Sequence, residues 1–590
     1  MKKHFRKVLS VAMCLLLAMT TMVGALGCSD RNSDAEPIDK TKTQLYIATY
    51  GGGYGTAFLQ DIEDRFEKWA IDNQKSYEDG KVGVQIYKTA SKSKYTANNL
   101  VTSIDNDAYE VYFVTNDALN SFVNDEVCKL YDITDAVTSD NPFDSQGKSI
   151  QDRIRPEMDD HHNLGDSETA KYYSLPFVDG GSGLTYDKDV FVKNELYFKK
   201  GGCASEFSAY TQANNTSPAV GTYSGDPTFT NGKNNVAKSA GPDGKYGTED
   251  DGLPATLAEF ELLVKQMKKK GVTSIIWSGA TQEAYTPFLA RAFANNYHGL
   301  AESAILKDGG GANGRETTII TGFDNDGNPI LEKNHKIGMD NLEDIARQAG
   351  YYYGLRMFEI MLENGTEDST VWQGKSHTEA QYKYIFSLPD AKIKDIAFLL
   401  DGTWWENEAD AAGSFDKCVK YLGANTAREK RNFAFFPMPW ADESQIGNKY
   451  TMAGGGGSFF VSERLPKEKQ QLIKDFIQFA FSDESLQRMT INIGIPAPFD
   501  YEMNETYEPQ MSSYTRSFYN IYRKSDIVYG FIDPELSVAL KDINDVITYT
   551  SSYDSTTSKS SYGTFPSAWR GKHISSQTFF TGMYYRAQGK

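Results

Sequence analysis

Aromatic side chains follow glycine at places in this sequence where a buried strand is expected to end. The clearest case is Gly402-Thr403-Trp404-Trp405, which comes after the apolar residues 396–400. We expect at least one of the two rings to project from the sheet edge and the other to be buried against the following helix. A projecting ring suits a pyranose, because the CH faces of a sugar stack on aromatic rings while carboxylates and amides take its hydroxyl groups.

Two further tryptophans stand at similar places. Trp277 follows the strand-like residues 272–276, and Trp440 follows the residues FPMP after another short strand. A ligand contact and ordinary core packing explain each of these rings equally well.

Carboxylates cluster in the loop of residues 241–256, which contains Asp243, Asp250 and Asp251 among glycines. Carboxylate oxygens on a tight loop can hold Ca²⁺, which makes these three aspartates a candidate calcium site. The loop lacks the spacing of an EF-hand, and a plain Asp-Gly turn is the alternative that the pattern favours. No cofactor is required by any motif.

Composition excludes several classes of function. The 590 residues carry a formal net charge of −18, and phosphate binding needs a basic field, so nucleic acid is excluded as a partner. The five cysteines form no CxxC pair and have no ligand-like spacing with the seven histidines, which argues against a zinc site. GxSxG, HExxH and P-loop motifs are absent from the sequence, and the GxGxxG spacing at residues 309–314 lacks the strand-to-helix context of a nucleotide site.

The first 27 residues have the features of an export signal. A basic start is followed by the apolar residues 8–18 and by small residues before Cys28. Ala25-Leu26-Gly27-Cys28 resembles a bacterial lipobox, with Ala25 in place of the usual leucine, which implies cleavage before Cys28 and acylation of its thiol. We therefore expect a signal peptide over 1–27, a polar tether over 28–42, and a lipid anchor at Cys28 on the extracellular face of the cell membrane.

Strands alternate with helices along the rest of the chain, which predicts an α/β fold with parallel sheets and helices on both faces. Ligands bind such sheets at the carboxyl ends of the strands, here the loops 50–55 and 115–117. Residues 171–191 contain two strand-like halves joined by Asp179-Gly180-Gly181, which indicates either a crossing between two lobes or a simple hairpin. Residues 201–252 lack apolar periodicity and are interpreted as a surface insertion.

Taken in order, the motifs resemble the bacterial extracellular solute-binding proteins of family 1, the carbohydrate receptors of ABC importers, similar to maltodextrin-binding proteins. The segments that carry the resemblance span nearly the whole chain after residue 42. They are the strand and glycine turn at 45–55, YEVYFVTNDALNSFVNDEVCKLYDITD, YYSLPFVDGGSGLTYDKDVF, LPATLAEFELLVKQM, DGTWWENEA, FPMPW, GGGGSFFVSERLPKEKQQLIKDFIQFAFSDES and NIGIPAP. Each segment is degenerate by itself, whereas the eight in this order after a lipobox are specific.

The resemblance implies a two-lobed α/β fold of the type II periplasmic-binding-protein kind, with hinge crossings and a central ligand cleft. The crossings are expected near 177–183, 452–458 and 495–498. Lobe 1 then comprises 43–178 and 454–493, and lobe 2 comprises 184–450 and 498–590, including the insertion.

The resemblance also implies binding residues. It places a sugar-stacking tryptophan in the segment that matches Gly402-Thr403-Trp404, so Trp404 is the first choice and Trp405 the second. Maltodextrin binders carry a hydroxyl-binding aspartate at the position of Asp117, next to Asn116, and an acidic contact in the segment of Asp179. The glycine turn lacks their acidic-basic pair, which puts maltose itself in doubt, and Tyr50 and Tyr54 are expected to supply ring contacts there instead.

The function implied is that of a lipid-anchored receptor that captures an oligosaccharide by lobe closure and delivers it unchanged to the transmembrane permease subunits of an importer. We expect a monomer without enzymatic activity, attached to the membrane only through its N-terminal lipid. Two alternatives remain: a surface glycoside hydrolase with a carboxylate pair, and a sugar-sensing or adhesion lipoprotein without a transport partner.

Overall fold

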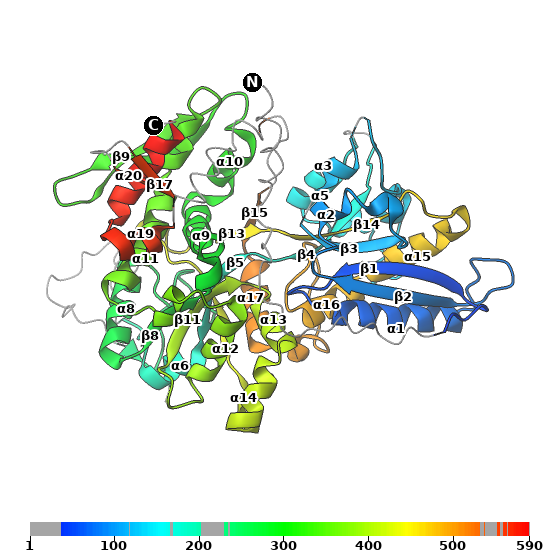
Figure 1. The fold of residues 1–590 in the computed structure, drawn as a ribbon, viewed down its shortest axis with the longest axis horizontal. Helices are drawn as coiled ribbons and strands as arrows, with labels where there is room; N and C mark the ends of the chain where they lie inside the picture. Colours follow the sequence, from blue (N-terminus) through cyan, green and yellow to red (C-terminus); the bar gives the residue numbers. More distant parts are fainter. Residues whose placement is uncertain are drawn as a thin grey trace, which may run out of the picture. The chain divides into compact units, whose positions relative to one another are not determined.

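The computed structural model describes residues 37–588 except 117, 125, 166–168, 202–228, 234–235, 531–535, 537–550, 555–558 and 563. The chain divides into two compact units (Figure 1). Unit 1 comprises Met1–Gly180 and Gly455–Met511, and unit 2 comprises Gly181–Gly454 and Ser512–Lys590. The expected signal peptide and Cys28 lie outside the described residues. The last residues of the expected tether, 37–42, belong to unit 1, because Val82 donates its backbone N–H to the carbonyl of Thr41 (2.8 Å).

Unit 1 is built on a five-stranded sheet in the order β2-β1-β3-β14-β4. Its strands are β1 (Thr43–Tyr50), β2 (Val84–Ser91), β3 (Val111–Thr115), β4 (Ser174–Asp179) and β14 (Gly456–Val461). Its helices are α1 (Ala57–Asp72), α2 (Ala97–Leu100), α3 (Leu119–Phe122), α4 (Thr134–Thr138), α5 (Pro156–His162), α15 (Gln470–Ala480) and α16 (Asp483–Ile493).

Helices cover both faces of this sheet (Figure 1). Apolar residues recur at helical spacing along α1 and are buried, and among them Phe58 packs edge-on against Phe113 of β3, with ring centroids 5.4 Å apart. Because neighbouring side chains of a strand point to opposite faces, Tyr112 and Val114 of β3 pack instead with residues of α2 and α3. The sheet of unit 1 therefore has a buried core on each side.

Unit 2 is built on a four-stranded sheet in the order β12-β5-β11-β8. The strands of unit 2 are β5 (Ser182–Asp187), β6 (Tyr197–Phe198), β7 (Phe229–Thr230), β8 (Thr273–Trp277), β9 (Arg315–Phe323), β10 (Pro329–Ile337), β11 (Ile396–Gly402), β12 (Phe433–Phe436), β13 (Thr451–Gly454), β15 (Asp526–Tyr529), β16 (Ser551–Asp554) and β17 (Lys559–Tyr562). Its helices are α6 (Lys188–Asn194), α8 (Leu257–Lys270), α9 (Gln282–Ser303), α10 (Ile305–Asp308), α11 (Ala349–Glu363), α12 (His377–Ser387), α13 (Trp405–Ala411), α14 (Ser414–Leu422), α17 (Ser513–Tyr522), α19 (Phe565–Lys572) and α20 (Ser576–Ala587).

The core of unit 2 is aromatic on both faces of its sheet. On one face, Phe398 of β11 contacts Phe191 of α6 and Phe260 of α8. On the other face, Tyr384 of α12 packs on Phe433 of β12. Thr256 caps the start of α8, because its side chain accepts a hydrogen bond from the backbone N–H of Glu259.

Both sheets are mixed, whereas the sequence predicted parallel sheets. β1 pairs in parallel with β2 and β3, but β14 runs antiparallel to β3 and β4. In unit 2, β11 is parallel to β8, and β5 is antiparallel to β11 and β12. The antiparallel strands β5 and β14 are the ones that begin directly after the chain passes from one unit to the other. Each enters its sheet at the edge where the parallel strands end, so it must run in the opposite direction.

The two strand-like halves of residues 171–191 do not form a hairpin. β4 pairs with β14 in the sheet of unit 1, and β5 pairs with β11 and β12 in the sheet of unit 2. The chain thus changes unit between Gly180 and Gly181, and it changes back between Gly454 and Gly455.

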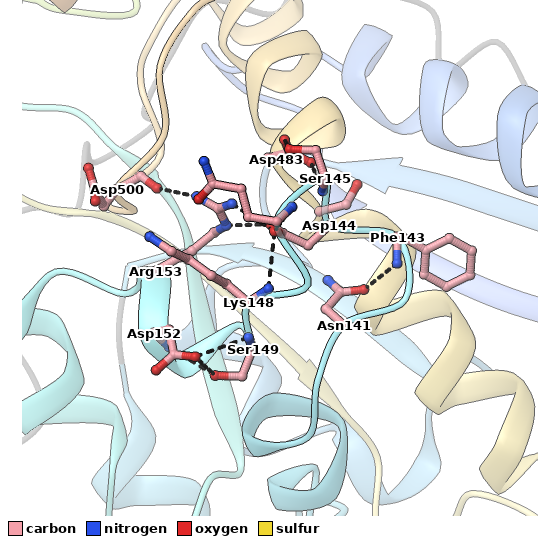
Figure 2. A network of polar contacts seen from close by, with 12 residues as sticks. Asn141, Phe143, Asp144, Ser145, Lys148, Ser149, Asp152, Arg153, Asp483 and Asp500 are labelled. Atoms are coloured by element: carbon pink, nitrogen blue, oxygen red, sulfur yellow. Dashed lines mark hydrogen bonds and ion pairs between the residues drawn. The ribbon is translucent and has the colours of Figure 1, made fainter.

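The third division lies between Met511 and Ser512 and not at 495–498, so residues 498–511 belong to unit 1. A polar network explains the difference (Figure 2). Arg153 donates to the backbone carbonyl of Asp500 (2.9 Å) and forms a buried ion pair with Asp144. The backbone N–H of Arg155 donates to the carbonyl of Pro498 (3.0 Å). These contacts hold the segment against unit 1, and no local sequence pattern reveals them.

The expected insertion is only partly described, since 202–228 and 234–235 lie outside the described residues. Its later part is more than a surface loop. Asp250 is buried and accepts a hydrogen bond from the hydroxyl of Tyr450 (2.5 Å), and the indole of Trp440 donates to the carbonyl of Pro242 (2.8 Å). None of the helices in the described part of the chain combines the length and the apolar character that a bilayer crossing requires.

Candidate functional site

The candidate residues of unit 1 gather at one edge of its sheet. β14 is antiparallel to both β3 and β4, so β1, β3 and β4 all run in the same direction. Their carboxyl ends place Tyr50, Asn116 and Asp179 at the same edge, which is where ligands bind in sheets of this kind.

Tyr50 and Tyr54 form an aromatic corner at this edge. Their ring centroids lie 5.8 Å apart in an edge-on arrangement, and Tyr54 also meets Phe177 of β4 edge-on at 6.1 Å. Burial, together with the charge of the nearby Asp179, raises the pKa of Tyr54 to about 12. A Cβ atom on Gly52 would lie 2.1 Å from Cε1 of Tyr50, so the ring of Tyr50 lies directly over the backbone of Gly52.

Asn116 and Asp179 both form hydrogen bonds with the backbone at the start of β14, next to the two tyrosines. Asn116 has a positive φ of 65°, and its N–H donates to the carbonyl of Gly456 (2.9 Å). Asp179 is 1% exposed, and its carboxylate accepts a hydrogen bond from the N–H of Gly455 (3.0 Å). Asp179 therefore fixes the start of β14 within unit 1. Asp117 lies outside the described residues.

The four candidate tryptophans follow strand ends at one edge of the sheet in unit 2. Trp277 ends β8, Trp404 and Trp405 follow β11, and Trp440 follows β12. These three strands run in the same direction, because β12 and β11 are both antiparallel to β5. The sequence therefore predicted correctly where along the strands the tryptophans lie, but their rings differ in direction.

Trp404 is held over the backbone that precedes it. A Cβ atom on Gly402 would lie 2.2 Å from Cε2 of Trp404, so the indole lies directly over Gly402. Trp404 as a whole is buried, with 8% of the residue exposed. This placement fixes one face of the ring against the backbone, which pre-orients the aromatic group at the strand end.

The rings of Trp405, Trp440 and Trp277 turn into the interior of unit 2. Trp405 is fully buried and contacts Phe433 and Tyr514 edge-on at 5.1 and 5.6 Å. Trp440 stacks on Tyr450 at 5.7 Å, and Trp277 meets Phe358 and Trp372 at 6.0 and 5.6 Å. In this structure the three rings are core residues. This is the core-packing alternative that the sequence left open for Trp277 and Trp440, and Trp405 is the buried member of its pair.

Thr403, which the sequence analysis did not single out, fixes the glycine-tryptophan segment. Its N–H donates to the carbonyl of Gly181 (2.8 Å), and its hydroxyl accepts a hydrogen bond from the N–H of Gly181 (3.1 Å). This reciprocal pair ties Trp404 to the first residue of unit 2. A threonine after glycine carries no local signal of such a role.

A buried polar cluster lies directly before this segment. The Gln381 amide nitrogen donates to the carboxylates of Asp401 (3.0 Å) and Glu408 (2.9 Å). Burial, and next to it the charge of Glu408, raises the pKa of Asp401 to about 7. Both carboxyl groups bind Gln381 in the interior, which suits them to position the backbone and not to transfer protons to a ligand.

Asp401 should make stability fall as pH rises through the range below neutrality. A carboxyl whose pKa is raised by folding binds its proton more tightly in the folded state, so the loss begins near the unfolded value, about 4, and ends near 7. Asp401→Asn should flatten this part of the profile, as measured by urea unfolding at several pH values. Asp416→Asn, at an exposed position of α14, is the control and should leave the profile unchanged. Equal profiles for Asp401→Asn and the wild type would contradict the assignment.

The carboxylates of Asp250 and Asp251 accept hydrogen bonds from N–H and O–H groups of the acidic loop itself. Asp250 accepts from the N–H of Asp243 (2.9 Å) and from the hydroxyl of Thr248 (2.5 Å), and Asp251 accepts from the N–H of Gly247 (2.9 Å). Burial, with the charge of Asp250, raises the pKa of Asp243 to about 6. Within the described residues, no group of three or more acidic, histidine or cysteine side chains is arranged to hold a metal. The loop therefore has the geometry of the alternative, a carboxylate-braced turn.

Comparison with known proteins identifies the fold. No protein-family model matches the sequence, and no curated protein matches it. A structure solved in a study of xylan utilization by the thermophilic bacterium Caldanaerobius polysaccharolyticus aligns with 92% of this chain and 99% of its own, at 14% identity and a TM-score of 0.50. A chitin oligosaccharide binding protein aligns with 93% of this chain and 98% of its own (12% identity, TM-score 0.48). A probable secreted solute-binding lipoprotein from Streptomyces coelicolor aligns with 94% and 100% (12% identity, TM-score 0.48). The first of these likenesses confirms the predicted α/β fold.

Proposed function

We propose that this protein is the extracellular receptor of an ABC importer, which binds an oligosaccharide and passes it unchanged to a permease. One observation carries the proposal. In each unit an aromatic ring is laid over a glycine at the carboxyl edge of the sheet, Tyr50 over Gly52 and Trp404 over Gly402. Rings fixed in this way offer flat apolar faces without the entropy cost of ordering them on binding.

The chemistry around these rings suits sugars. A pyranose stacks its CH face on an aromatic ring and needs hydrogen-bond partners for its hydroxyl groups. In unit 1 the hydroxyl of Tyr54 and the amide of Asn116 lie at the same edge as Tyr50, and the sequence places Asp117 next to Asn116. The fold is also shared with a protein studied in xylan utilization, which makes xylo-oligosaccharides the first ligands to test.

In the proposed mechanism, the bound oligosaccharide is contacted by residues of both units and favours a closed state. The chain changes unit three times, so a few backbone angles at these places can absorb a hinge rotation. A ligand shifts such an equilibrium only by its difference in affinity for the two states. Closure is thus the signal that we propose the permease recognises.

The sequence supports a location of this protein on the outer side of the cell membrane. The leader over 1–27 and Cys28 support export and lipid attachment, and the polar residues that follow support a tether to the outer side of the cell membrane. The excess of acidic residues repels an anionic bilayer, so we propose that the lipid is the sole membrane contact.

Titration with oligosaccharides tests the proposal. Xylo-, chito-, malto- and raffinose-type oligosaccharides are added to the purified protein while tryptophan fluorescence and thermal unfolding are recorded. One series should change both signals, and saturation at 100 times Kd should stabilise the protein by about 2.7 kcal/mol. Chromatography after long incubation should recover the sugar unchanged.

Three outcomes decide between the alternatives. The absence of any response at millimolar sugar would reject sugar binding. Cleaved sugar would establish a glycoside hydrolase instead. Binding without cleavage by a protein whose gene has no neighbouring permease genes would favour the sensing or adhesion role.

A further inference from the structure

A polar cavity of about 380 Å³ lies within unit 2, remote in sequence from the glycine-tryptophan segment. Its wall comes from the start of α6, the segment before the acidic loop, the acidic loop itself and the end of α17. The lining residues are Tyr186, Lys188, Lys238, Gly247, Thr248, Glu249, Asp251, Asn520 and Lys524. Its volume falls within the range of pockets that hold small organic ligands, about 300–1,000 Å³.

The charges in this wall leave a positive excess. Glu249 is engaged by Lys188 (3.4 Å) and by the amide of Asn520 (3.1 Å). Asp251 accepts hydrogen bonds from the backbone of Gly247 and Thr248. Among the residues that the structure describes, Lys238 and Lys524 form no ion pair. Two ammonium groups therefore line the cavity outside any ion pair that the described residues form, in a chain whose net charge is −18.

Lys238 is held in a fixed, partly desolvated position. Its ammonium nitrogen lies 3.4 Å from the ring centroid of Tyr197. A Cβ atom on Gly252 would lie 3.0 Å from Cδ of Lys238, so the stem runs along the backbone of the acidic loop. Burial, followed by the charge of Lys188, lowers the pKa of Lys238 to about 8. A desolvated ammonium group gains most from a charged hydrogen-bond acceptor.

We propose that this cavity is a second binding site, separate from the oligosaccharide site, and that it takes a small molecule carrying an oxyanion, with Lys238 and Lys524 as the anion-binding groups. The hydroxyl oxygen of Thr248 and the amide oxygen of Asn520 can accept hydrogen bonds from the polar part of the ligand. The carboxylates of Glu249 and Asp251 disfavour ligands with a large negative charge, because they stand in the same wall.

Calorimetric titration of the full chain tests the site. Sulfate is the probe for the oxyanion alone, and glucuronate and glucose 6-phosphate are the probes for an organic acid, with glucose and chloride at matched ionic strength as negative controls. Saturable binding of sulfate or of at least one organic acid is expected. Binding of sulfate alone identifies an inorganic anion as the ligand class, and tighter binding of a sugar acid identifies an organic one. Absence of saturable binding by all three probes at 10 mM, about the weakest range of specific recognition, would overturn the proposal.

Variants locate the binding. Lys238→Met should weaken the binding of the responding probe about tenfold or more, and Lys524→Gln, at an exposed position, should weaken it without affecting folding. Lys245→Gln also removes one positive charge, from a position on the acidic loop outside the cavity wall, and should leave the affinity unchanged. Equal losses in all three variants would show a diffuse charge effect and reject the site.

The pH profile separates a binding role of Lys238 from a structural one. The groups around its ammonium are Lys188, Lys524, Asp251, Glu249 and the phenols of Tyr186 and Tyr197. The pKa of Lys238 itself, lowered to about 8 by burial, lies between pH 7 and 9.5. Sulfate does not titrate in this range. Sulfate affinity should therefore fall about tenfold or more from pH 7 to 9.5 in the wild type and remain nearly constant in Lys238→Met. A parallel fall in both proteins would contradict the assigned role.

Discussion

Arg153→Met is expected to lower the free energy of unfolding of unit 1 by about 3–5 kcal/mol. The guanidinium of Arg153 forms a two-pronged ion pair with Asp144, one of whose bonds is 2.8 Å, and the Asp144 side chain has no exposed surface. Removing the cation leaves a buried carboxylate whose charge is no longer neutralised. It also frees the carbonyl of Asp500, which Arg153 holds in place (Figure 2).

Unfolding in guanidinium chloride, combined with hydrogen exchange, measures this loss. Faster exchange should be confined to residues 141–155 and 496–511, because these are the two segments that Arg153 connects. Lys68→Met is the control, since Lys68 and Asp72 are 74% and 56% exposed and such a pair contributes less than about 1 kcal/mol.

A double variant separates the uncompensated charge from lost packing. Asp144→Asn with Arg153→Met removes both charges, so it should recover part of the stability lost in Arg153→Met. A loss below about 1 kcal/mol in Arg153→Met would show that the pair is dispensable, and would leave the third division of the chain without its structural explanation.

Trp404→Ala is expected to weaken oligosaccharide binding about 30-fold or more, which corresponds to about 2 kcal/mol. The indole is fixed over Gly402 before the sugar arrives, so the loss is that of a stacking face and not of an ordered loop. Gly402→Ala should have a similar effect, because its Cβ atom would overlap the ring at 2.2 Å and force it away. Fluorescence or calorimetric titration with the best ligand of the panel measures both losses.

The neighbouring tryptophan supplies a matched control. Trp405 is fully buried among Tyr384, Phe433 and Tyr514, so Trp405→Phe should reduce stability by about 1–3 kcal/mol and change the affinity by less than about threefold. If Trp405→Phe lowers the affinity more than Trp404→Ala does, the assignment of the stacking ring to Trp404 is wrong.

Local patterns were sufficient for the elements. At the crossing after β4 they left a simple hairpin open, and the family resemblance was what favoured a crossing. The apolar spacing of α1, the threonine cap of α8 and the glycine pair after Asp179 are all visible within short windows. The direction of the strands could not be predicted from local patterns, because the antiparallel course of β5 and β14 follows from where the chain re-enters each unit. The third division depends on Arg153 and Asp500, which are far apart in sequence and carry no shared motif.

The same distinction applies to the candidate site. The sequence shows that Trp277, Trp404, Trp405 and Trp440 follow strands, and this position along the strand is confirmed. It does not show which ring turns inward, since that depends on partners such as Phe358, Tyr514 and Tyr450 from distant segments. Thr403 and the cluster around Gln381 were missed for the same reason.

The strand order of unit 1 also constrains how the chain can fold during synthesis. β14 stands between β3 and β4, yet it is made only after all of residues 181–454. Until residue 461 has emerged, β3 and β4 each keep an open edge with unpaired backbone groups, which invites pairing with other chains. The sheet of unit 1 therefore cannot be completed from its N-terminal segment alone, and its open edges persist on a nascent chain until residue 461 has been made.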